Sequence, residues 1–266
     1  MSPATREALR APVVELAQRA GEAIMAVYRS DFAVEHKDDR SPLTEADLAA
    51  HRIIAAGLGR LDPSLPVLSE ESAVIPHAER AGWRRYWLVD PLDGTREFVK
   101  RNGEFTVNIA LIEDGEPTLG VIYAPALDEL AHAVRGGGAV GVVAGGAREL
   151  KVSPRRAEPW RVAGSRSHRD PRTEAFLARI GGHELLALGS SLKFCRLAAG
   201  ELDVYVRYGP TSEWDTGAGQ CILEEAGGRV TDLSGAPLTY NRRESLINPD
   251  FIASAGTPER WRAHAA

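Results

Sequence analysis

The first two segments of the chain carry apolar and polar residues with the spacing of amphipathic helices. Residues 10–29 place apolar side chains on one helical face, with Pro12 near the first turn, where proline is tolerated. Residues 41–58, SPLTEADLAAHRIIAAGL, predict a second helix. Because Thr44 is followed three residues later by Asp47, the pair resembles a capping box, and this helix should begin after Thr44.

Segments rich in β-formers follow the two helices. Residues 66–72, PVLSEES, predict a short strand that runs into a loop, and residues 85–90, RYWLVD, predict a buried strand. Residues 105–143 alternate apolar runs with turn residues, and Asp114 with Gly115 is a strong hairpin signal. We therefore expect a meander of four or five antiparallel strands, with the helices packed on it.

After about residue 154, strands and helices alternate. The expected strands are 161–165, 184–189, 202–207, 229–233 and 251–256, and the expected helices are 171–180, 191–200 and 216–228, with a short helix near the end. This alternation predicts an α/β layer. The sequence thus suggests two domains, an α+β domain over 1–153 and an α/β domain over 154–266.

Composition and charge narrow the function classes. The chain has 266 residues, 44% hydrophobic and 26% charged, which is ordinary for a globular protein. A net charge of −5 argues against non-specific nucleic-acid binding, but a bound cation could still recruit a phosphorylated substrate. Cys195 and Cys221 lie in predicted helices and favour buried free thiols. No signal peptide or spanning segment is recognisable, which predicts a cytoplasmic protein.

The stretch WLVDPLDGTREF ends the buried strand with two carboxylates. Asp90 and Asp93 flank Pro91, and Gly94 and Thr95 follow at once. Turns commonly contain Asp-Pro and Asp-Gly, so a plain turn explains either aspartate alone. However, a Gly-Thr pair that enters a helix offers backbone N–H groups to a phosphate. Two carboxylates would repel that phosphate unless a cation lies between them, which predicts a metal–phosphate site.

Other acidic segments could complete such a site. Glu70 and Glu71 follow a short apolar strand, and Asp215 precedes a helix rich in small residues. A solvated loop explains the glutamates singly, and a helix N-cap explains Asp215. Together with the two aspartates they would supply a two-metal centre with ions roughly 4 Å apart. Hard oxygen ligands without a Cys or His cluster favour Mg²⁺ over zinc.

The motifs DPLDGTREF and WDTGAG resemble the paired signatures of the inositol monophosphatase superfamily of Mg²⁺-dependent, lithium-sensitive phosphomonoesterases, and LSEES fits its third acidic segment. The resemblance extends to about residue 255 and implies a layered αβαβα sandwich of the inositol monophosphatase / fructose-1,6-bisphosphatase type. KRNGEFTVNIALI and SSLK with VYVRY are closer to the branch of bacterial 3′(2′),5′-bisphosphate nucleotidases, the CysQ type. That branch converts 3′-phosphoadenosine 5′-phosphate into AMP and phosphate.

The resemblance also implies the metal ligands. Glu70, Asp90 and the Leu92 carbonyl would hold the first Mg²⁺, and Asp90, Asp93 and Asp215 the second, most of them in 1–153 and Asp215 in 154–266. A third, weaker ion near Glu70 is an alternative. Because Leu92 would use only its backbone oxygen, its side chain should be replaceable.

In the implied mechanism, a water molecule attacks phosphorus in line, without a covalent enzyme intermediate. Thr95 would orient the water, and Asp47 would accept from its hydroxyl unless Asp47 only caps a helix. Glu70 would be catalytic as well, whereas Glu71 would lie beyond the ligands or in solvent. The implied substrate contacts are Glu70, Leu92, Asp93, Gly94, Thr95, Ser190, Lys193, Arg207 and Asp215.

The nucleotide's second phosphate needs a cation and its sugar needs donors. Lys193 and Arg207 lie in apolar segments, which favours function over ordinary surface charge, and Ser190 is expected one turn before Lys193 on one helix face. Weaker candidates are Lys100, Arg101 and His168.

Two other interpretations stay open. An inositol-1-phosphatase or another sugar-phosphate phosphatase would use the same metal centre with a different pocket wall. An RNA-associated regulatory protein would act by binding RNA rather than by turning over a substrate. We expect a small nucleotide substrate and no stable nucleic-acid partner. Relatives suggest either a monomer or a homodimer, in the cytoplasm or peripherally at the inner membrane.

Overall fold

The structure, a computed structural model, describes residues 1–30, 34–36, 42–72, 75–143, 146–165 and 170–265. Its helices are α1 (Pro3–Tyr28), α2 (Glu45–Leu61), α3 (His77–Arg80), α4 (Thr95–Val99), α5 (Pro171–Ile180), α6 (Leu192–Ala198), α7 (Glu213–Glu225) and α8 (Glu259–Ala265). Its strands are β1 (Val34–His36), β2 (Pro42–Thr44), β3 (Val67–Ser69), β4 (Arg85–Asp93), β5 (Thr106–Glu113), β6 (Glu116–Ala124), β7 (Glu129–Val134), β8 (Ala139–Val143), β9 (Gly146–Leu150), β10 (Trp160–Ser165), β11 (His183–Leu188), β12 (Val204–Arg207), β13 (Arg229–Asp232) and β14 (Phe251–Ser254).

The larger sheet has seven strands, β3 to β9 in sequence order. β3 is parallel to β4, and the strands from β4 to β9 are antiparallel. β5 to β8 form the meander predicted over 105–143, and β4 and β9 extend it to six strands. Both faces of its centre are buried: Trp87 and Val89 pack toward one core, whereas Leu88 packs toward another. This two-sided burial explains why β4 and β5 are continuously apolar rather than alternating.

The smaller of the two main sheets has the order β11-β10-β12-β14-β13, and β1 and β2 form a separate antiparallel pair. β10 is parallel to β11 and β12, as the predicted strand–helix alternation requires, and α5 and α6 lie between these strands in sequence. β14 runs antiparallel to both β12 and β13. β14 alone therefore runs against the other four strands and makes the sheet mixed, a feature that strand periodicity does not encode.

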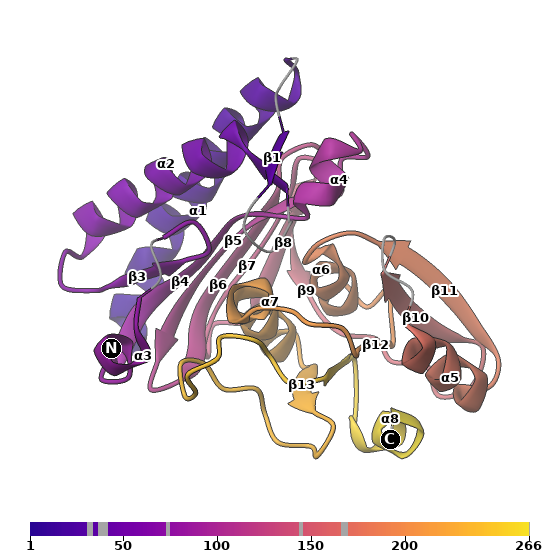
Figure 1. The fold of residues 1–266 in the computed structure, drawn as a ribbon. Coiled ribbons are helices and arrows are strands. Elements are labelled where there is room, and N and C mark those ends of the chain that lie inside the picture. The colour runs from indigo at the N-terminus through magenta and orange to yellow at the C-terminus, as the bar shows by residue number, and fades with distance from the viewer. Residues whose placement is uncertain (31–33, 37–41, 73–74, 144–145, 166–169, 266) are drawn as a thin grey trace.

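The two sheets and six of the helices stack as five layers (Figure 1). α1 and α2 cover one face of the large sheet, α6 and α7 lie between the sheets, and α5 and α8 cover the outer face of the small sheet. Three separate hydrophobic cores fill the spaces between layers. The predicted αβαβα sandwich is confirmed.

Some details differ from the prediction or remain predictions. α1 begins at Pro3 instead of residue 10, because Ser2 caps it by accepting from the Thr5 N–H at 3.2 Å and proline suits the first turn. The proposed domain boundary at 153–154 falls between β9 and β10 but remains a prediction. Both cysteines are free, as expected, but only Cys221 is buried, whereas Cys195 is half-buried. No helix in the described part of the chain is long and apolar enough to cross a bilayer.

Candidate metal centre

A bulge at the end of β4 places Asp90 and Asp93 on one face. Asp90 lies opposite Asn108 of β5 and Asp93 lies opposite Thr106, and the register shifts between these pairs. Asn108 and Thr106 are two residues apart and therefore share a face, whereas residues three apart in a regular strand point to opposite faces. The extra residue beside Pro91 thus brings both carboxylates to the same side of the sheet.

The third carboxylate comes from α7. Asp215 is the third residue of α7, which begins at Glu213 rather than at the predicted residue 216. Its Oδ2 accepts the N–H of Ser212 at 2.8 Å, so Ser212 is the N-cap and the alternative that Asp215 is itself the N-cap is wrong. The capping box fixes Asp215 at the start of the helix, facing β4.

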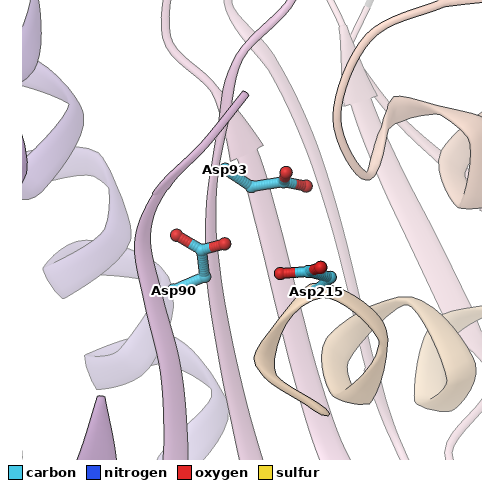
Figure 2. Close-up of side chains that lie close together, drawn as sticks. All are labelled: Asp90, Asp93 and Asp215. Atoms are coloured by element: carbon cyan, nitrogen blue, oxygen red, sulfur yellow. The ribbon is translucent and has the colours of Figure 1, made fainter. Parts of the chain in front are cut away.

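Asp90, Asp93 and Asp215 converge (Figure 2), and each offers a carboxylate oxygen within 4.8 Å of the other two. Burial is the main reason why the pKa of Asp90 lies well above its usual range, and the charges of Glu70 and Asp93 raise it further. Burial, then Asp93 and Glu70, likewise raise the pKa of Asp215. Burial and mutual repulsion both destabilise the charged carboxylates, and a hard divalent cation would offset this cost. These residues therefore fit the predicted Mg²⁺.

The two glutamates behave differently. The Glu70 N–H donates to the Val89 carbonyl at 3.1 Å, which ties the residue to β4, and Glu70 lines the same cleft as the aspartates. Burial lowers the pKa of His51, and the nearby charge of Glu71 partly offsets this effect. The structure thus brings Glu70 to the cluster, and the more distant role of Glu71 remains a prediction.

Asp47 contacts both partners that the sequence suggested for it. Its Oδ2 accepts the backbone N–H of Thr44 at 2.8 Å and the Thr44 hydroxyl at 2.6 Å, so the capping box is confirmed. Its Oδ1 lies 3.4 Å from the Thr95 hydroxyl, which is also 3.3 Å from the Leu92 carbonyl. The catalytic role of Asp47 remains a prediction.

The expectation that the Leu92 side chain is replaceable is wrong. This side chain is almost completely buried, in the core between the large sheet and α1 with α2. Truncating a leucine in such a place costs about 2–5 kcal/mol in stability. The next residue but one, Gly94, caps α4 with a φ of 90°, a left-handed conformation that favours glycine.

Three residues that the sequence analysis missed also belong to the site. The Ser191 hydroxyl lies 2.6 Å from Asp93 Oδ2, and the Asn108 amide donates to Ser191 at 2.8 Å. Thr106 donates to the Asn108 carbonyl oxygen at 3.0 Å. An asparagine inside the apolar strand TVNIALI was the available signal, because a buried amide needs polar partners.

The acidic cluster lies in a cleft of about 650 Å³, lined by residues from both halves of the chain. Ser190, Lys193 and Arg207 all line it. Ser190 is not on α6, however, which begins at Leu192; it has a φ of 43° in the tight turn from β11, so the predicted shared helix face is wrong. The Lys193 ammonium still reaches it and donates to its backbone oxygen at 2.8 Å.

Contacts within the protein fix the side chains of Lys193 and Arg207. Lys193 is 6% exposed, and its ammonium lies 5.3 Å from the centre of the Tyr205 ring. Burial lowers the pKa of Lys193 to about 8. The Arg207 guanidinium donates to the carbonyls of Gly209 and Pro210 at 3.1 and 3.2 Å.

The structure gives no support to a substrate contact by the weaker candidates Lys100, Arg101 and His168. The described lining of the cleft includes neither Lys100 nor Arg101. Arg101 instead donates to the backbone oxygens of Tyr28, the last residue of α1, and Ser30, at 2.5 and 2.7 Å. His168 lies outside the described residues.

Comparison with known proteins adds a family likeness over almost the whole chain. A sequence profile of the inositol monophosphatase family matches residues 5–265. The 3′(2′),5′-bisphosphate nucleotidase CysQ of Salmonella typhimurium is 51% identical over 242 residues, 90% of this chain and 96% of that protein. The protein of the same name from Escherichia coli K12 is 49% identical over 245 residues, 91% and 98% of the two chains.

Solved structures show the same fold. CysQ from Bacteroides thetaiotaomicron, described as a bacterial member of the inositol monophosphatase family, superposes with a TM-score of 0.82 at 40% identity, covering 92% of this chain and 96% of that one. An IMPase of Thermotoga maritima gives a TM-score of 0.78 at 28% identity over 95% and 94% of the chains.

Proposed function

This chain belongs to the inositol monophosphatase family, and on that premise we propose that it removes the 3′-phosphate of 3′-phosphoadenosine 5′-phosphate to give AMP and phosphate. The observation that carries the proposal is the convergence of Asp90, Asp93 and Asp215 in a cleft that Lys193 and Arg207 also line. Likeness to relatives named 3′(2′),5′-bisphosphate nucleotidase supports the choice of substrate.

The metal dependence is assigned to the acidic residues. Glu70, Asp90 and the Leu92 carbonyl would hold one Mg²⁺, and Asp90, Asp93 and Asp215 a second, with a third ion near Glu70 as a variant of the scheme. The pKa values of Asp90 and Asp215 are raised by burial first and by the neighbouring carboxylates second. They support this assignment, because a bound cation would stabilise the charged form of both groups. Bound divalent ions polarise the phosphoryl group and stabilise the leaving oxygen.

The chain's own groups position the reacting atoms. Asp47 holds the Thr95 hydroxyl at 3.4 Å, and Thr95 orients the attacking water toward phosphorus. Asp47 is 2% exposed and accepts two hydrogen bonds from Thr44, which fix the carboxylate that faces the Thr95 hydroxyl. The backbone N–H groups of Gly94 and Thr95 bind the transferred phosphate.

The remaining charges select the nucleotide. Lys193 and Arg207 bind the second phosphate, and Ser190 contacts the sugar. The Ser190 hydroxyl is buried and has no hydrogen-bond partner in the part of the chain that the structure describes, which supports a role for it toward a ligand. These contacts distinguish a bisphosphate nucleotide from inositol-1-phosphate, which carries a single phosphate.

Phosphate release from 3′-phosphoadenosine 5′-phosphate and inositol-1-phosphate, measured side by side, tests the proposal. We expect Mg²⁺-dependent release with a clear preference for the nucleotide, abolished by chelator. Asp93→Asn should lower kcat by at least about a hundredfold, because it removes one anionic ligand. Asp114→Asn, an aspartate exposed on the β5–β6 turn, is the matched control and should leave the rate unchanged.

The outcomes separate the alternatives. Preference for inositol-1-phosphate would retain the metal centre and overturn the roles of Ser190, Lys193 and Arg207. No release from either substrate, together with tight RNA binding, would favour the regulatory interpretation.

A further inference from the structure

A buried serine lies where the carboxylate-bearing segments of the two halves meet. Ser191 is 2% exposed and immediately precedes α6. Its hydroxyl oxygen is 2.6 Å from Asp93 Oδ2 on β4 and 2.9 Å from the backbone oxygen of Asp215 on α7. The Ser191 side chain thus contacts both elements that supply the aspartates.

The hydrogen bonds around Ser191 define which group donates. The Asn108 amide donates to the serine oxygen at 2.8 Å, and Thr106 fixes that amide by donating to its carbonyl oxygen at 3.0 Å. A hydroxyl has one proton, and the shorter contact to a charged acceptor receives it. Ser191 therefore donates to Asp93 Oδ2.

This arrangement holds one side of the Asp93 carboxylate. Both hydrogen bonds described for that carboxylate, from Ser191 at 2.6 Å and from Asn108 at 3.3 Å, end on Oδ2. Oδ1 accepts no hydrogen bond from the described residues and is therefore available to a cation in the acidic cluster. Hydrogen bonds of this kind orient ligand carboxylates and tune metal affinity.

Helix capping does not account for the Ser191 hydroxyl. Ser191 occupies the N-cap position of α6, but its side chain makes no capping hydrogen bond. A serine at an N-cap normally uses its oxygen to accept from the first turn. Here the hydroxyl points to the aspartates instead.

We propose that Ser191 is a positioning residue for the metal centre, which fixes the Asp93 carboxylate of β4 by donating to its Oδ2. The inference rests on the proposed metal-dependent function. It assigns to Ser191 no contact with substrate or with the reacting atoms.

Calorimetric binding of Mn²⁺ to the substrate-free protein tests this role without relying on turnover. Ser191→Ala should weaken binding at one metal site by about tenfold or more, as loss of an outer hydrogen bond does elsewhere. Ser254→Ala is the matched control, because Ser254 is fully buried in β14 and donates to a single backbone oxygen at 3.0 Å. It should lower thermal stability without changing Mn²⁺ affinity.

Two further variants keep the test decisive. Asn108→Ala should weaken Mn²⁺ binding in the same direction, and the double variant should be no worse than Ser191→Ala alone, because both act through one hydrogen-bonded unit. If Ser191→Ala does not fold, Asn108→Ala carries the test. Ser191→Thr keeps the hydroxyl and should restore most of the affinity.

Mn²⁺ affinity of Ser191→Ala within about twofold of wild type, or an equal loss in Ser254→Ala, would overturn the inference. If Ser191→Ala fails to fold, unchanged affinity in Asn108→Ala overturns it. A wild type that binds Mn²⁺ but releases no phosphate would contradict the proposed function and leave the Ser191 comparison intact. A wild type that binds no Mn²⁺ would overturn both.

Discussion

At the scale of single residues, the site depends on side chains that meet two demands at once. Asp47 caps α2 with one carboxylate oxygen and faces Thr95 with the other. Asp215 closes a capping box at the start of α7 and joins the acidic cluster. Cap and site are compatible because a carboxylate has two oxygens, each with more than one lone pair.

Lys193 should make substrate preference depend on pH. Burial lowers its pKa to about 8, so it is protonated below that pH and neutral above it. The ratio of kcat/KM for 3′-phosphoadenosine 5′-phosphate to that for inositol-1-phosphate should fall about tenfold between about pH 7 and pH 9, because kcat/KM reports the free enzyme. Taking the ratio cancels the effect of enzyme ionisations that change kcat/KM equally for both substrates.

Lys193→Met is the control for this effect, because it keeps the length of the side chain without the charge. Its ratio should be low at neutral pH and flat across the range. A ratio in wild type that does not change with pH would exclude Lys193 as a phosphate contact.

At the scale of elements, the position of Asp215 depends on how closely α7 approaches the large sheet. α7 packs on β4, β5, β6 and β7. A Cβ at Gly120 of β6 would lie 2.5 Å from the backbone oxygen of Ala218 and 3.0 Å from the Cβ of Cys221. Only glycine lets the helix backbone come this near, since the clash is with main chain that cannot rotate away.

Gly120→Ala should therefore push α7 from the sheet. We expect a loss of about 1–3 kcal/mol in unfolding free energy, measured by urea denaturation, and weaker Mn²⁺ binding because Asp215 moves with the helix. Gly59→Ala is the matched control: its Cβ would meet nothing within 4 Å on α2, and there alanine should stabilise. Unchanged stability in Gly120→Ala would mean that the helix tolerates displacement.

At the scale of the whole molecule, a buried ion pair stabilises the chain segment that connects the large sheet to the small sheet. Asp203 is almost fully buried and accepts the N–H groups of Arg155 and Arg161 at 2.7 and 2.8 Å, as well as the Arg161 guanidinium. Burial alone would raise the pKa of Asp203, but these hydrogen bonds outweigh it and hold the pKa below its usual range. The segment that joins β9 to β10 is thus tied to the start of β12.

Asp203→Asn should destabilise the protein by about 2 kcal/mol near neutral pH. Because the folded pKa is lowered, the unfolded chain takes up the proton first as pH falls. The stabilisation is fully present above about pH 5 and is lost as pH falls below about 4. The measurement is urea unfolding in chelator at several pH values. The difference between wild type and variant should shrink toward pH 3, and a constant difference would contradict the assignment.

Much of the architecture and the chemistry of the site was determined by the sequence itself. Periodicity and turn residues predicted α2, α5, the meander and the strand–helix alternation, because these depend on contacts between residues near in sequence. The motifs around Asp90 and Asp215, with Glu70, indicated a metal centre, since acidic residue types at strand and helix ends limit the chemistry.

Tertiary structure alone decided how those residues meet. The β4 bulge that brings Asp90 and Asp93 to one face depends on pairing with β5, and the antiparallel β14 depends on a neighbouring strand. Ser191 and Asn108, 83 residues apart, become partners only when α6 docks between the sheets. Such contacts leave no local pattern, because the physical forces that select them act between segments distant in the chain.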